Sequence, residues 1–554
     1  MKHNILKSLA VAASLALATA CVEETIPRGG SLTENQVSGL KQSTDYMINY
    51  LASSMMATET MGYGLPSDFG IGSIHIMTDC MLEDIACMAS NTGYFWYGDY
   101  AACTYQGSRY IYCSYFWDCF YSWIKSANDV IARIDMDTAN EHDITILGQA
   151  HAYRAYFYLN LARMYEPKEN KYIDIDPTIK NLTVPIVTEN TTEKQASNNP
   201  RVSVEKIYQF IFEDLEKATE LLKGKKISYT MPSETMVNVL YARAYIELGA
   251  AGDNEAYEKA IEYADKVIKE SGKSPLTSAQ WHDPVNGFNN GSSNNAWIWG
   301  LPSNSAIQGN LGTFIEQMSP EAQWGYSTIT ELGINKDLYE QISSKDFRKY
   351  SFFDPKGMEY YKYPMAGNAE DQKNRLEGNR ALGLMPLKPY SSFKFRPNDG
   401  NVSDFTIGNA GDLCMMRVEE MYFIKAEAQA QLGTLGEATK TLDEVINTRY
   451  DDKSYKSSSK TYDKESFLEE LLLQKRIEFW GEGILFFDYK RLDHGIMRSY
   501  KGSNHAAEFA LNCDGRSPQW NFVITRKETQ SNTAIPESLN NPDPSDFVEP
   551  TPIG

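Results

Sequence analysis

Two stretches of this chain repeat one pattern of small residues, and that pattern constrains the fold more than any other feature. Residues 242–249 read ARAYIELG and residues 426–433 read AEAQAQLG, so both follow A-x-A-x-x-x-L-G. Each is followed by a second alanine-bearing stretch, YEKAIEYADKVI from Tyr257 and GEATKTLDEVI from Gly436. Alanine lets two helices approach closely, and the Leu-Gly pair ends the first helix and turns the chain. The sequence therefore predicts helical hairpins.

Apolar residues recur with helical spacing in several other stretches of the chain. We expect one hairpin from residues 115–136 with 143–165, and another from 204–222 with 233–249. Ser203 is the expected N-cap of the helix over 204–222. Stacked helical hairpins are the architecture of tetratricopeptide repeats. We therefore predict a mostly α-helical fold built from tetratricopeptide-like hairpins.

Helical periodicity is lost between residues 272 and 411. Gly, Asn, Ser and Pro are frequent there, as in FNNGSSNNAWIWGLPSN from Phe288. An irregular segment of this length inside a compact protein usually carries function. We predict a functional segment over 272–411 between two helical regions, 42–271 and 412–554, and we expect the proline-rich end of the second to wrap over the surface.

The first twenty residues have the features of an export signal. A basic start is followed by an apolar run and then by small residues before Cys21. Residues 18–21, Ala-Thr-Ala-Cys, resemble a bacterial lipobox, although Leu17 lies one place earlier than the usual leucine. We predict a signal peptide over 1–20, lipid on Cys21 and a tether over 21–41; the alternative is a plain secretory signal with a chance cysteine. No later stretch reaches the ~20 apolar residues that span a bilayer.

Charge and motifs exclude several classes of function. The formal net charge is −20, which argues against nucleic acid because phosphate binding needs clustered Lys and Arg. The sequence contains no HExxH, no G-x-S-x-G and no Walker A loop. We therefore expect neither an enzyme nor a bound cofactor.

Two polar features allow a chemical interpretation and a structural one. Glu478 and Glu482 lie one helical turn apart, and ion pairing with Lys475, Arg476 or Arg491 is favoured over acid–base catalysis. The loop Asn398-Asp399-Gly400-Asn401 has oxygen ligands suited to calcium, but an ordinary turn is the favoured interpretation. A structural calcium stays open as the alternative.

Besides Cys21, the chain has seven cysteines, an odd number that leaves at least one unpaired. No CxxC occurs and no Cys/His set has zinc spacing. We expect most of them to be small buried hydrophobic residues. A disulfide among the five N-terminal ones remains an alternative. The seven are Cys80, Cys87, Cys103, Cys113, Cys119, Cys414 and Cys513.

Fourteen of the thirty residues from 94 to 123 are aromatic, against 12% of the whole chain. From Trp117 onward the apolar residues have helical spacing, so we expect Trp117, Tyr121, Ile124, Ile131 and Ile134 in the core. Residues 91–112 have no such period and contain three glycines. Their rings are the better candidates for an exposed platform that stacks on sugars or grips a peptide.

Four passages resemble the SusD/RagB-like nutrient-binding lipoproteins of the Bacteroidota outer membrane. WDCFYSWIKSANDVIARID with GQAHAYRAYFYLNLARMYE is similar to two helices of that family. DLCMMRVEEMYFIKAEAQAQLG, LLLQKRIEFWGEGILFFDYKRLDHG and AIPESLNNP resemble three further passages in the family's order. Val418, Met421, Gln474 and Ile484 depart from the common residues at positions that are structural in the family.

The resemblance implies a tetratricopeptide-like scaffold on which an irregular region binds ligand. It also implies a lipid-anchored protein on the cell surface that delivers oligosaccharide to a SusC-like TonB-dependent barrel. In glycan-binding members the contacts come from two regions that correspond here to about 79–112 and 288–330. The expected contacts are Asp84, Asn91, Tyr94, Phe95, Trp96, Tyr97 and Tyr100 in the first, and Trp297, Trp299, Asn310, Trp324 and Tyr326 in the second.

Three alternatives to glycan binding remain open at the level of the sequence. The same architecture binds peptides in RagB-like members. A tetratricopeptide scaffold for envelope assembly would need no ligand site of this kind. A lipid-anchored glycoside hydrolase would need two opposed carboxylates beside a cleft.

Overall fold

The structure, a computed structural model, describes residues 43–547 except 60, 90–105, 286, 309–311, 330 and 358–359. Asn91, Tyr94, Phe95, Trp96, Tyr97, Tyr100, Asn310 and Cys21 lie outside the described residues. The helices of eight or more residues are α3 (Ser43–Ser54), α4 (Ile71–Cys80), α6 (Ile111–Arg133), α7 (Glu141–Tyr165), α9 (Val204–Leu222), α10 (Glu234–Ala250), α11 (Asn254–Glu270), α16 (Ala369–Glu377), α18 (Glu419–Gln431), α19 (Leu435–Ile446), α20 (Lys464–Glu478) and α21 (Leu485–Leu492).

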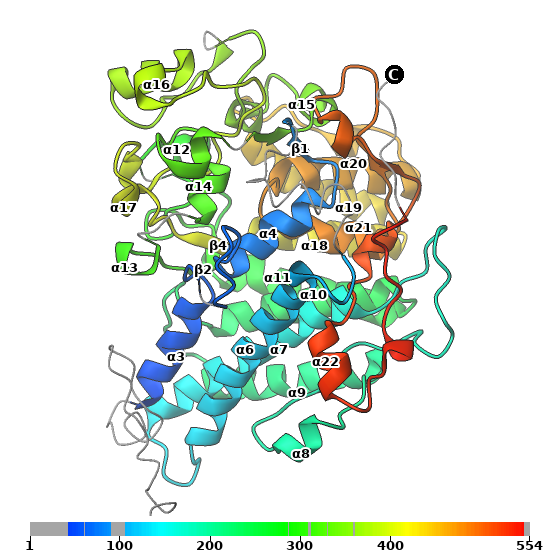
Figure 1. Ribbon diagram of the computed structural model, residues 1–554. Helices are drawn as coiled ribbons and strands as arrows, with labels where there is room; N and C mark the ends of the chain where they lie inside the picture. The colour runs from blue at the N-terminus through cyan, green and yellow to red at the C-terminus, as the bar shows by residue number, and fades with distance from the viewer. Residues whose placement is uncertain are drawn as a thin grey trace, which may run out of the picture.

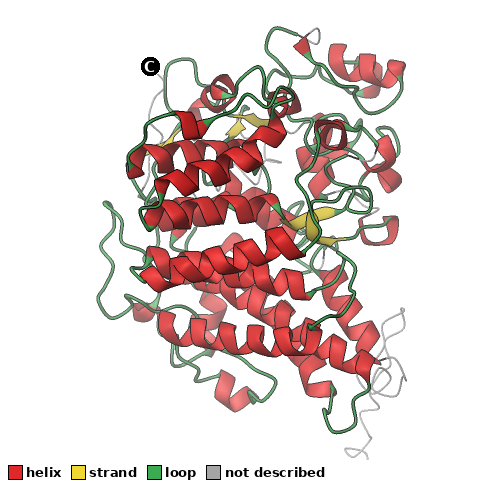
Figure 2. Cartoon of the chain, turned by 180° about the vertical axis from the view of Figure 1, so that it is seen from behind, coloured by secondary structure: helices red, strands yellow, loops and turns green. Residues whose placement is uncertain are grey.

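Most of the long helices lie side by side through the body of the molecule (Figures 1 and 2). Contacts run from α6 to α7, from α7 to α9, from α10 to α11, and from α11 through α18 to α19 and α20. The predicted hairpins α6–α7, α10–α11 and α18–α19 are confirmed. Helix α9 packs on α10 as predicted, but chiefly on α7. The prediction of a mostly helical fold with stacked hairpins is therefore confirmed.

Local sequence explains where several of these helices begin. The Ser203 hydroxyl accepts a hydrogen bond from the Lys206 N–H, so Ser203 caps α9 as predicted. Asn140 caps α7 by accepting from the N–H groups of His142 and Asp143. In α7 both the Ala-bearing face and the opposite face are buried, because α6 covers one side and α9 another. Such a helix shows little amphipathic contrast in its sequence.

Helix α6 contains the second half of the aromatic run. Trp117, Ile124 and Ile131 are buried as predicted, while Tyr121 and Ile134 are half-buried against the core. The Trp117 ring meets the Tyr165 ring edge-on at a centroid distance of 5.2 Å. The helix begins at Ile111, so the prediction of an aperiodic loop up to residue 112 was wrong at its end.

Only one helix longer than six residues, α16, occurs in the described part of 272–411. The others are α12 (Ser278–His282), α13 (Ser305–Gln308), α14 (Phe314–Met318), α15 (Lys336–Gln341) and α17 (Phe405–Gly408). Figure 1 shows α12, α13, α14, α16 and α17 gathered at one side of the helical stack. The elements of this segment are therefore short, as the loss of periodicity predicts.

Short antiparallel strands occur in three pairs within the described residues, and two of these pairs link distant parts of the chain. Strand β1 (Ile85–Cys87) pairs with β3 (Leu332–Ile334), β2 (Trp297–Leu301) with β4 (Leu413–Arg417), and β5 (Ile496–Met497) with β6 (Asn512–Cys513). The β2–β4 pair joins the irregular segment to the start of α18.

The segment that follows the short helix α22 (Arg526–Ser531) lies against the first half of the chain, beside the residues after α8 (Glu193–Ala196). The Arg201 guanidinium donates to the Leu539 carbonyl at 2.8 Å and to the Asn541 side chain at 3.1 Å. The Asn532 amide donates to the Asn199 carbonyl at 2.6 Å. These bonds fix the terminal segment to the scaffold.

Glu478 and Glu482 are structural, as predicted, but their partners are different residues. Glu478 is buried and pairs with Arg348, Arg417 and Arg449, while Glu482 pairs with Lys394 and Arg417. The predicted partners bind other carboxylates: Lys475 and Arg491 pair with Asp488, and Arg476 with Asp84. The correct partners come from distant segments, which spacing within one helix does not reveal.

The cysteines of the described part are buried free thiols, which confirms their interpretation as small hydrophobic residues. They are Cys80, Cys87, Cys113, Cys119, Cys414 and Cys513; Cys103 lies outside the described residues. Among these six no disulfide forms. The helices described between residues 43 and 547 include none with the length and apolar character needed to cross a bilayer.

Candidate functional site

The β1–β3 pair brings together the two regions expected to bind ligand. Ile85 lies opposite Ile334, and the Met88 N–H donates to the Glu331 carbonyl at 2.9 Å just beyond the pair. On the other side, the Cys87 carbonyl accepts from the Ala506 N–H at 2.8 Å. Met88, which precedes the aromatic-rich stretch in the sequence, therefore lies beside Glu331 of the irregular segment.

Gly333 in β3 allows the segment at Tyr390 to approach this strand closely. A Cβ atom at that position would lie 2.7 Å from the Tyr390 carbonyl oxygen and 2.9 Å from the Met88 methyl carbon. Both distances are shorter than ordinary contacts, and the backbone carbonyl cannot move aside as the Met88 side chain can, so glycine is required beside Tyr390. The end of the aromatic-rich stretch is fixed as well, because the Gln106 N–H donates to the Ser545 hydroxyl at 3.0 Å.

Asp84, expected to contact ligand, instead forms part of the interior. Its carboxylate accepts from Arg476 Nε at 2.9 Å and Nη2 at 2.6 Å, and the residue is buried. The prediction of a ligand contact at Asp84 is therefore corrected. Its partner lies 392 residues away, so the sequence around Asp84 carried no sign of it.

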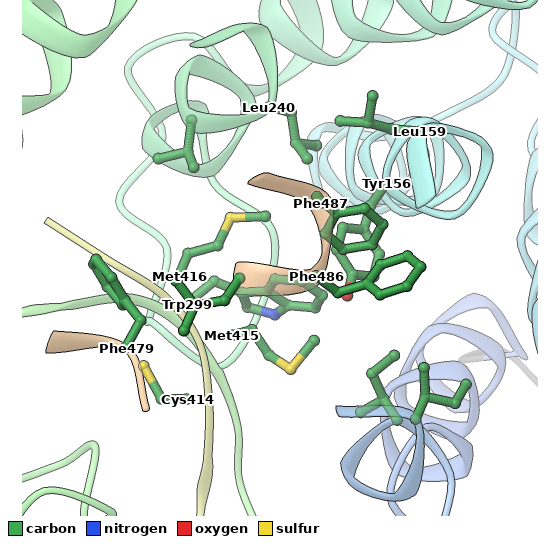
Figure 3. Packing of buried hydrophobic residues seen from close by; sticks show 14 of the residues in the cluster. Tyr156, Leu159, Leu240, Trp299, Cys414, Met415, Met416, Phe479, Phe486 and Phe487 are labelled. Carbon is green, nitrogen blue, oxygen red and sulfur yellow. The ribbon is translucent and has the colours of Figure 1, made fainter. Parts of the chain in front are cut away.

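The prediction that Trp297 and Trp299 contact ligand is also corrected, because both rings lie entirely within the core. The Trp299 ring meets the Tyr156 ring edge-on at 5.0 Å, and Figure 3 shows it among Tyr156, Met415 and Met416. The stretch WIWGL forms β2, and all five of its residues are buried by the scaffold and by β4. Neither ring can offer a face to a ligand in this structure.

Trp324 has only 8% of its surface exposed. Its indole N–H donates to the Asn409 side chain at 3.0 Å, and its ring packs on Gly408, where a Cβ atom would lie 2.4 Å from the ring. Tyr326 is half-buried, and its N–H donates to Glu316 Oε1 at 2.7 Å. Of the four aromatic candidates that the structure describes, Tyr326 keeps the most open surface.

Exposed aliphatic side chains were not predicted, yet they distinguish this side of the molecule. More than half of the large apolar side chains exposed in the described part of the chain lie within 272–411. They are Val285, Ile329, Tyr360, Leu382, Met385, Phe405 and Ile407. Apolar side chains gathered on one region of a surface mark an interaction site more often than scattered ones do.

Arg375 in α16 holds one part of this surface together. Its guanidinium donates to the Pro320 carbonyl, to the Met385 carbonyl at 2.6 Å and to the Ser327 carbonyl at 3.1 Å. The exposed Ile329 and Met385 side chains therefore lie on two segments that the buried Arg375 guanidinium connects by hydrogen bonds. Local sequence gave no signal for this, because the clamp links carbonyls from separate loops.

Glu316 is a buried carboxylate of this face that backbone N–H groups hold in place. Burial raises the pKa of Glu316, and its carboxylate accepts from the N–H groups of Gly312 and Tyr326 in its own segment. The loop Asn398–Gly400 is a 3₁₀ turn, and the Asn401 side chain accepts from the Asp404 N–H at 2.9 Å. That bond is typical of the ordinary turn that the sequence favours.

Asp79, at the start of the first expected binding region, is a buried carboxyl whose ionisation should oppose folding. Its Oδ2 accepts from the Gly483 N–H at 3.0 Å, and burial raises its pKa to about 8. Because this lies above the ordinary 3.8, the folded protein holds a proton that the unfolded chain releases. The stability from this group is present below about pH 4 and is lost as pH rises through about 8.

We therefore expect Asp79→Asn, which keeps the acceptor for Gly483, to raise the thermal midpoint, and the gain to grow as pH rises from about 4 to about 8. Thermal unfolding measured at about pH 5 and about pH 8 checks this. Asp137→Asn, at an exposed position, is the control and should show no such growth. A gain that is equal at both pH values would contradict an ionisation of Asp79 near neutral pH.

Comparison with known proteins now adds to this geometry. The family model described as the SusD family matches residues 241–545. A second family model, described as starch-binding associating with outer membrane, matches residues 74–246. No curated protein sequence matches the chain.

Solved structures with the same fold cover nearly the whole chain. A SusD-like carbohydrate-binding protein from Bacteroides vulgatus has a TM-score of 0.68 and 20% identity, covering 89% of this chain and 96% of its own. A SusD superfamily protein from Bacteroides thetaiotaomicron has a TM-score of 0.67 and 20% identity, covering 90% and 99%. Surface glycan-binding protein A from Bacteroides thetaiotaomicron, in complex with laminarihexaose, has a TM-score of 0.62 and 16% identity, covering 90% and 99%.

Proposed function

The chain belongs to the SusD family, and from that premise we propose that it is a non-catalytic protein that binds oligosaccharide at the face around the β1–β3 pair. The observation that carries the proposal is the fixed junction of the aromatic-rich stretch with the irregular segment, beside the exposed apolar side chains of that segment. Flat rings stack on sugars, and a rigid frame lowers the entropic cost of binding. The family description and the glycan-bound relative support the ligand class.

We propose that the ligand is held chiefly by Tyr94, Phe95, Trp96, Tyr97 and Tyr100, with Asn91 and Asn310 hydrogen-bonding its hydroxyl groups. Tyr326 is retained as a contact because it keeps the most open surface of the four described aromatic candidates. Trp297, Trp299, Trp324 and Asp84 are not included, since their side chains are buried in the protein. The binding surface thus depends more on the first region than the sequence suggested.

Placement in the cell is a further part of the proposal. The signal-like residues 1–20 and Cys21 support a lipid-anchored protein of the outer membrane that faces outward and passes ligand to a SusC-like TonB-dependent barrel. The description of the second matching family, which names the outer membrane, supports the same location. Labelling with a palmitate analogue in cells that carry wild-type or Cys21→Ala protein would test the anchor.

The double variant Trp96→Ala/Tyr97→Ala should weaken binding of oligosaccharide by roughly thirtyfold, because each ring removes a stacking surface. Its thermal midpoint should stay close to that of the parent. A glycan array identifies the ligand for the parent protein, and isothermal titration then compares the variants.

Tyr50→Ala is the matched control, since Tyr50 is 63% exposed on α3 and lies outside both expected regions. Equal weakening by Tyr50→Ala would argue against a site at Trp96. A large loss of thermal stability in the double variant would instead place those rings in the core.

Peptide binding is the second candidate function, and the exposed aliphatic side chains favour it. Ile329, Leu382 and Met385 offer apolar contacts without a flat ring, which suits peptide side chains better than sugar rings. Binding of the parent protein to a peptide library, with no glycan retained on the array, would establish this function in place of the first.

A further inference from the structure

Helix α20 carries apolar residues on two sides. Phe467, Leu471 and Ile477 are buried toward α18 and α19, on which the helix packs. Leu468 and Leu473 lie at the two edges of the exposed face of the same helix, where they pack partly on the core and stay half-exposed. A helix at the edge of a stack needs only one apolar face, so the second face calls for a separate explanation.

The second face lines a groove of about 720 Å³. Leu468, Leu472, Leu473 and Leu492 supply apolar surface, and Gln341 of α15 and Gln431 of α18 lie across from α20. The groove adjoins a cleft of about 650 Å³, since Arg476 and His494 line both. Either volume lies in the range of ligand sites and is ample for several side chains.

The charges around the groove are mostly negative. Its lining has three acids, Glu465, Glu469 and Glu470, and two bases, Lys460 and Arg476. Arg476 is already paired with Glu83 and Asp84, and Lys460 with Glu470. Glu465 and Glu469 form no ion pair with any residue that the structure describes.

The adjoining cleft continues this charge. Its acids are Glu83, Asp337, Asp493 and Asp514, against Lys171 and Arg476. His494 at the junction adds no positive charge near neutral pH, because burial and then Arg476 lower its pKa to about 4. The groove therefore combines the apolar surface of its leucines with an acidic border that continues into the cleft.

We propose that this groove holds a cationic, amphipathic segment of another protein, with apolar side chains on the leucines and Lys or Arg beside Glu465 and Glu469. Charge complementarity indicates that the bound segment is cationic, because an anionic or purely apolar segment would leave the carboxylates of Glu465 and Glu469 unpaired. Arrays of helical hairpins commonly present such surfaces to extended or helical segments. The four α20 residues tested below, Glu465, Leu468, Glu469 and Leu473, are not among the residues proposed to contact oligosaccharide.

The test uses a fluorescein-labelled amphipathic peptide of lysine and leucine, its glutamate/leucine counterpart, and the full-length protein. Anisotropy should show that the lysine peptide binds the parent protein and that binding weakens as salt rises. Glu465→Lys/Glu469→Lys should weaken it by roughly tenfold. Leu468→Asn/Leu473→Asn should weaken it too, without changing the charge.

The matched control is Glu216→Lys/Glu220→Lys, which makes the same charge change at the same spacing on the exposed side of α9. Equal weakening by this control would overturn the proposal, because binding would then follow net charge alone. Equal binding of the glutamate peptide would overturn it as well. So would light scattering that shows a dimer of this chain lost in Glu465→Lys/Glu469→Lys, because the occupant would then be a second copy. Oligosaccharide binding of all three double variants should match the parent, so the two proposals fail separately.

Discussion

Glu478→Gln is expected to lower the free energy of unfolding by about 3–5 kcal/mol, because it leaves buried arginines without their shared partner. Glu478 Oε1 accepts from Arg417 Nη1 and from Arg449 Nη2 at 2.6 Å each. Its Oε2 accepts from Arg449 Nε at 2.9 Å and from Arg348 Nη1 at 3.0 Å. All four residues are buried, so water cannot replace the lost carboxylate.

The buried ion-pair network around Glu478 has equal numbers of positive and negative groups, so removing one charge leaves a net charge inside the protein. Its four cations are Arg348, Lys394, Arg417 and Arg449, and its four anions are Asp346, Glu419, Glu478 and Glu482. Glutamine keeps the shape of the side chain but leaves one uncompensated positive charge inside the protein. Breaking such a cluster costs far more than deleting a surface pair.

Urea unfolding followed by circular dichroism at neutral pH measures this loss as a lower midpoint with an unchanged slope. Glu469→Gln, on the exposed side of the same helix, is the control and should change the free energy by less than about 0.5 kcal/mol. A loss of that small size in Glu478→Gln would mean that the arginines find other partners.

The effect of Glu478→Gln should also depend on pH. Burial alone would raise the pKa of Glu478, but Arg449 and Arg417 outweigh it and hold the pKa well below its ordinary 4.5. A group with a depressed pKa stabilises the fold above its unfolded-state value and loses that contribution as pH falls through its folded-state value. The difference between parent and variant should therefore shrink as pH falls below about 4.5.

Trp299→Ala is the second large effect, expected to lower the free energy of unfolding by about 3–5 kcal/mol. The ring has no exposed surface and contacts the rings of Tyr153 and Tyr156 edge-on, at 5.7 and 5.0 Å (Figure 3). Alanine would leave a cavity between β2 and α7, and the surrounding side chains cannot collapse fully into it. Trp299→Phe should lose less than half as much, because a ring remains.

This variant separates a core residue from a binding residue. If Trp299 packs the core, urea unfolding shows the loss, while oligosaccharide binding measured well below the midpoint stays within about threefold of the parent. If Trp299 belonged to the ligand site, binding would fall sharply and the unfolding midpoint would hardly move. The second pattern would reverse our correction of the sequence-based assignment.

Sequence patterns predicted the scaffold well because its helices are long and periodic. The A-x-A-x-x-x-L-G stretches mark α10 and α18, and both pack against a following helix. Local spacing sets these features, so one sequence suffices to find them. The family resemblance predicted the same architecture.

The candidate site was harder to predict because distant segments decide which side chains are exposed. Trp297 and Trp299 occur among Gly, Asn and Ser as a surface loop would, but β4 covers them from more than a hundred residues away. The sequence suggested that Asp84 contacts the ligand, but in the structure its carboxylate pairs with Arg476. The exposed Ile329 and Met385 show no periodic pattern that would have predicted their place.

The position of β1 has a consequence for how the molecule forms. This three-residue strand pairs with residues 332–334 on one side and bonds to Ala506 on the other. Both partners are synthesised long after the strand itself. Contacts between residues so far apart in the sequence form slowly, because the entropic cost of closing a large loop comes before the stabilising contacts form. The helical hairpins can form early from near neighbours, whereas the face around β1 and β3, where we propose that oligosaccharide binds, should be among the last parts to form. A chain stopped before residue 506 would thus carry a scaffold without a finished binding face.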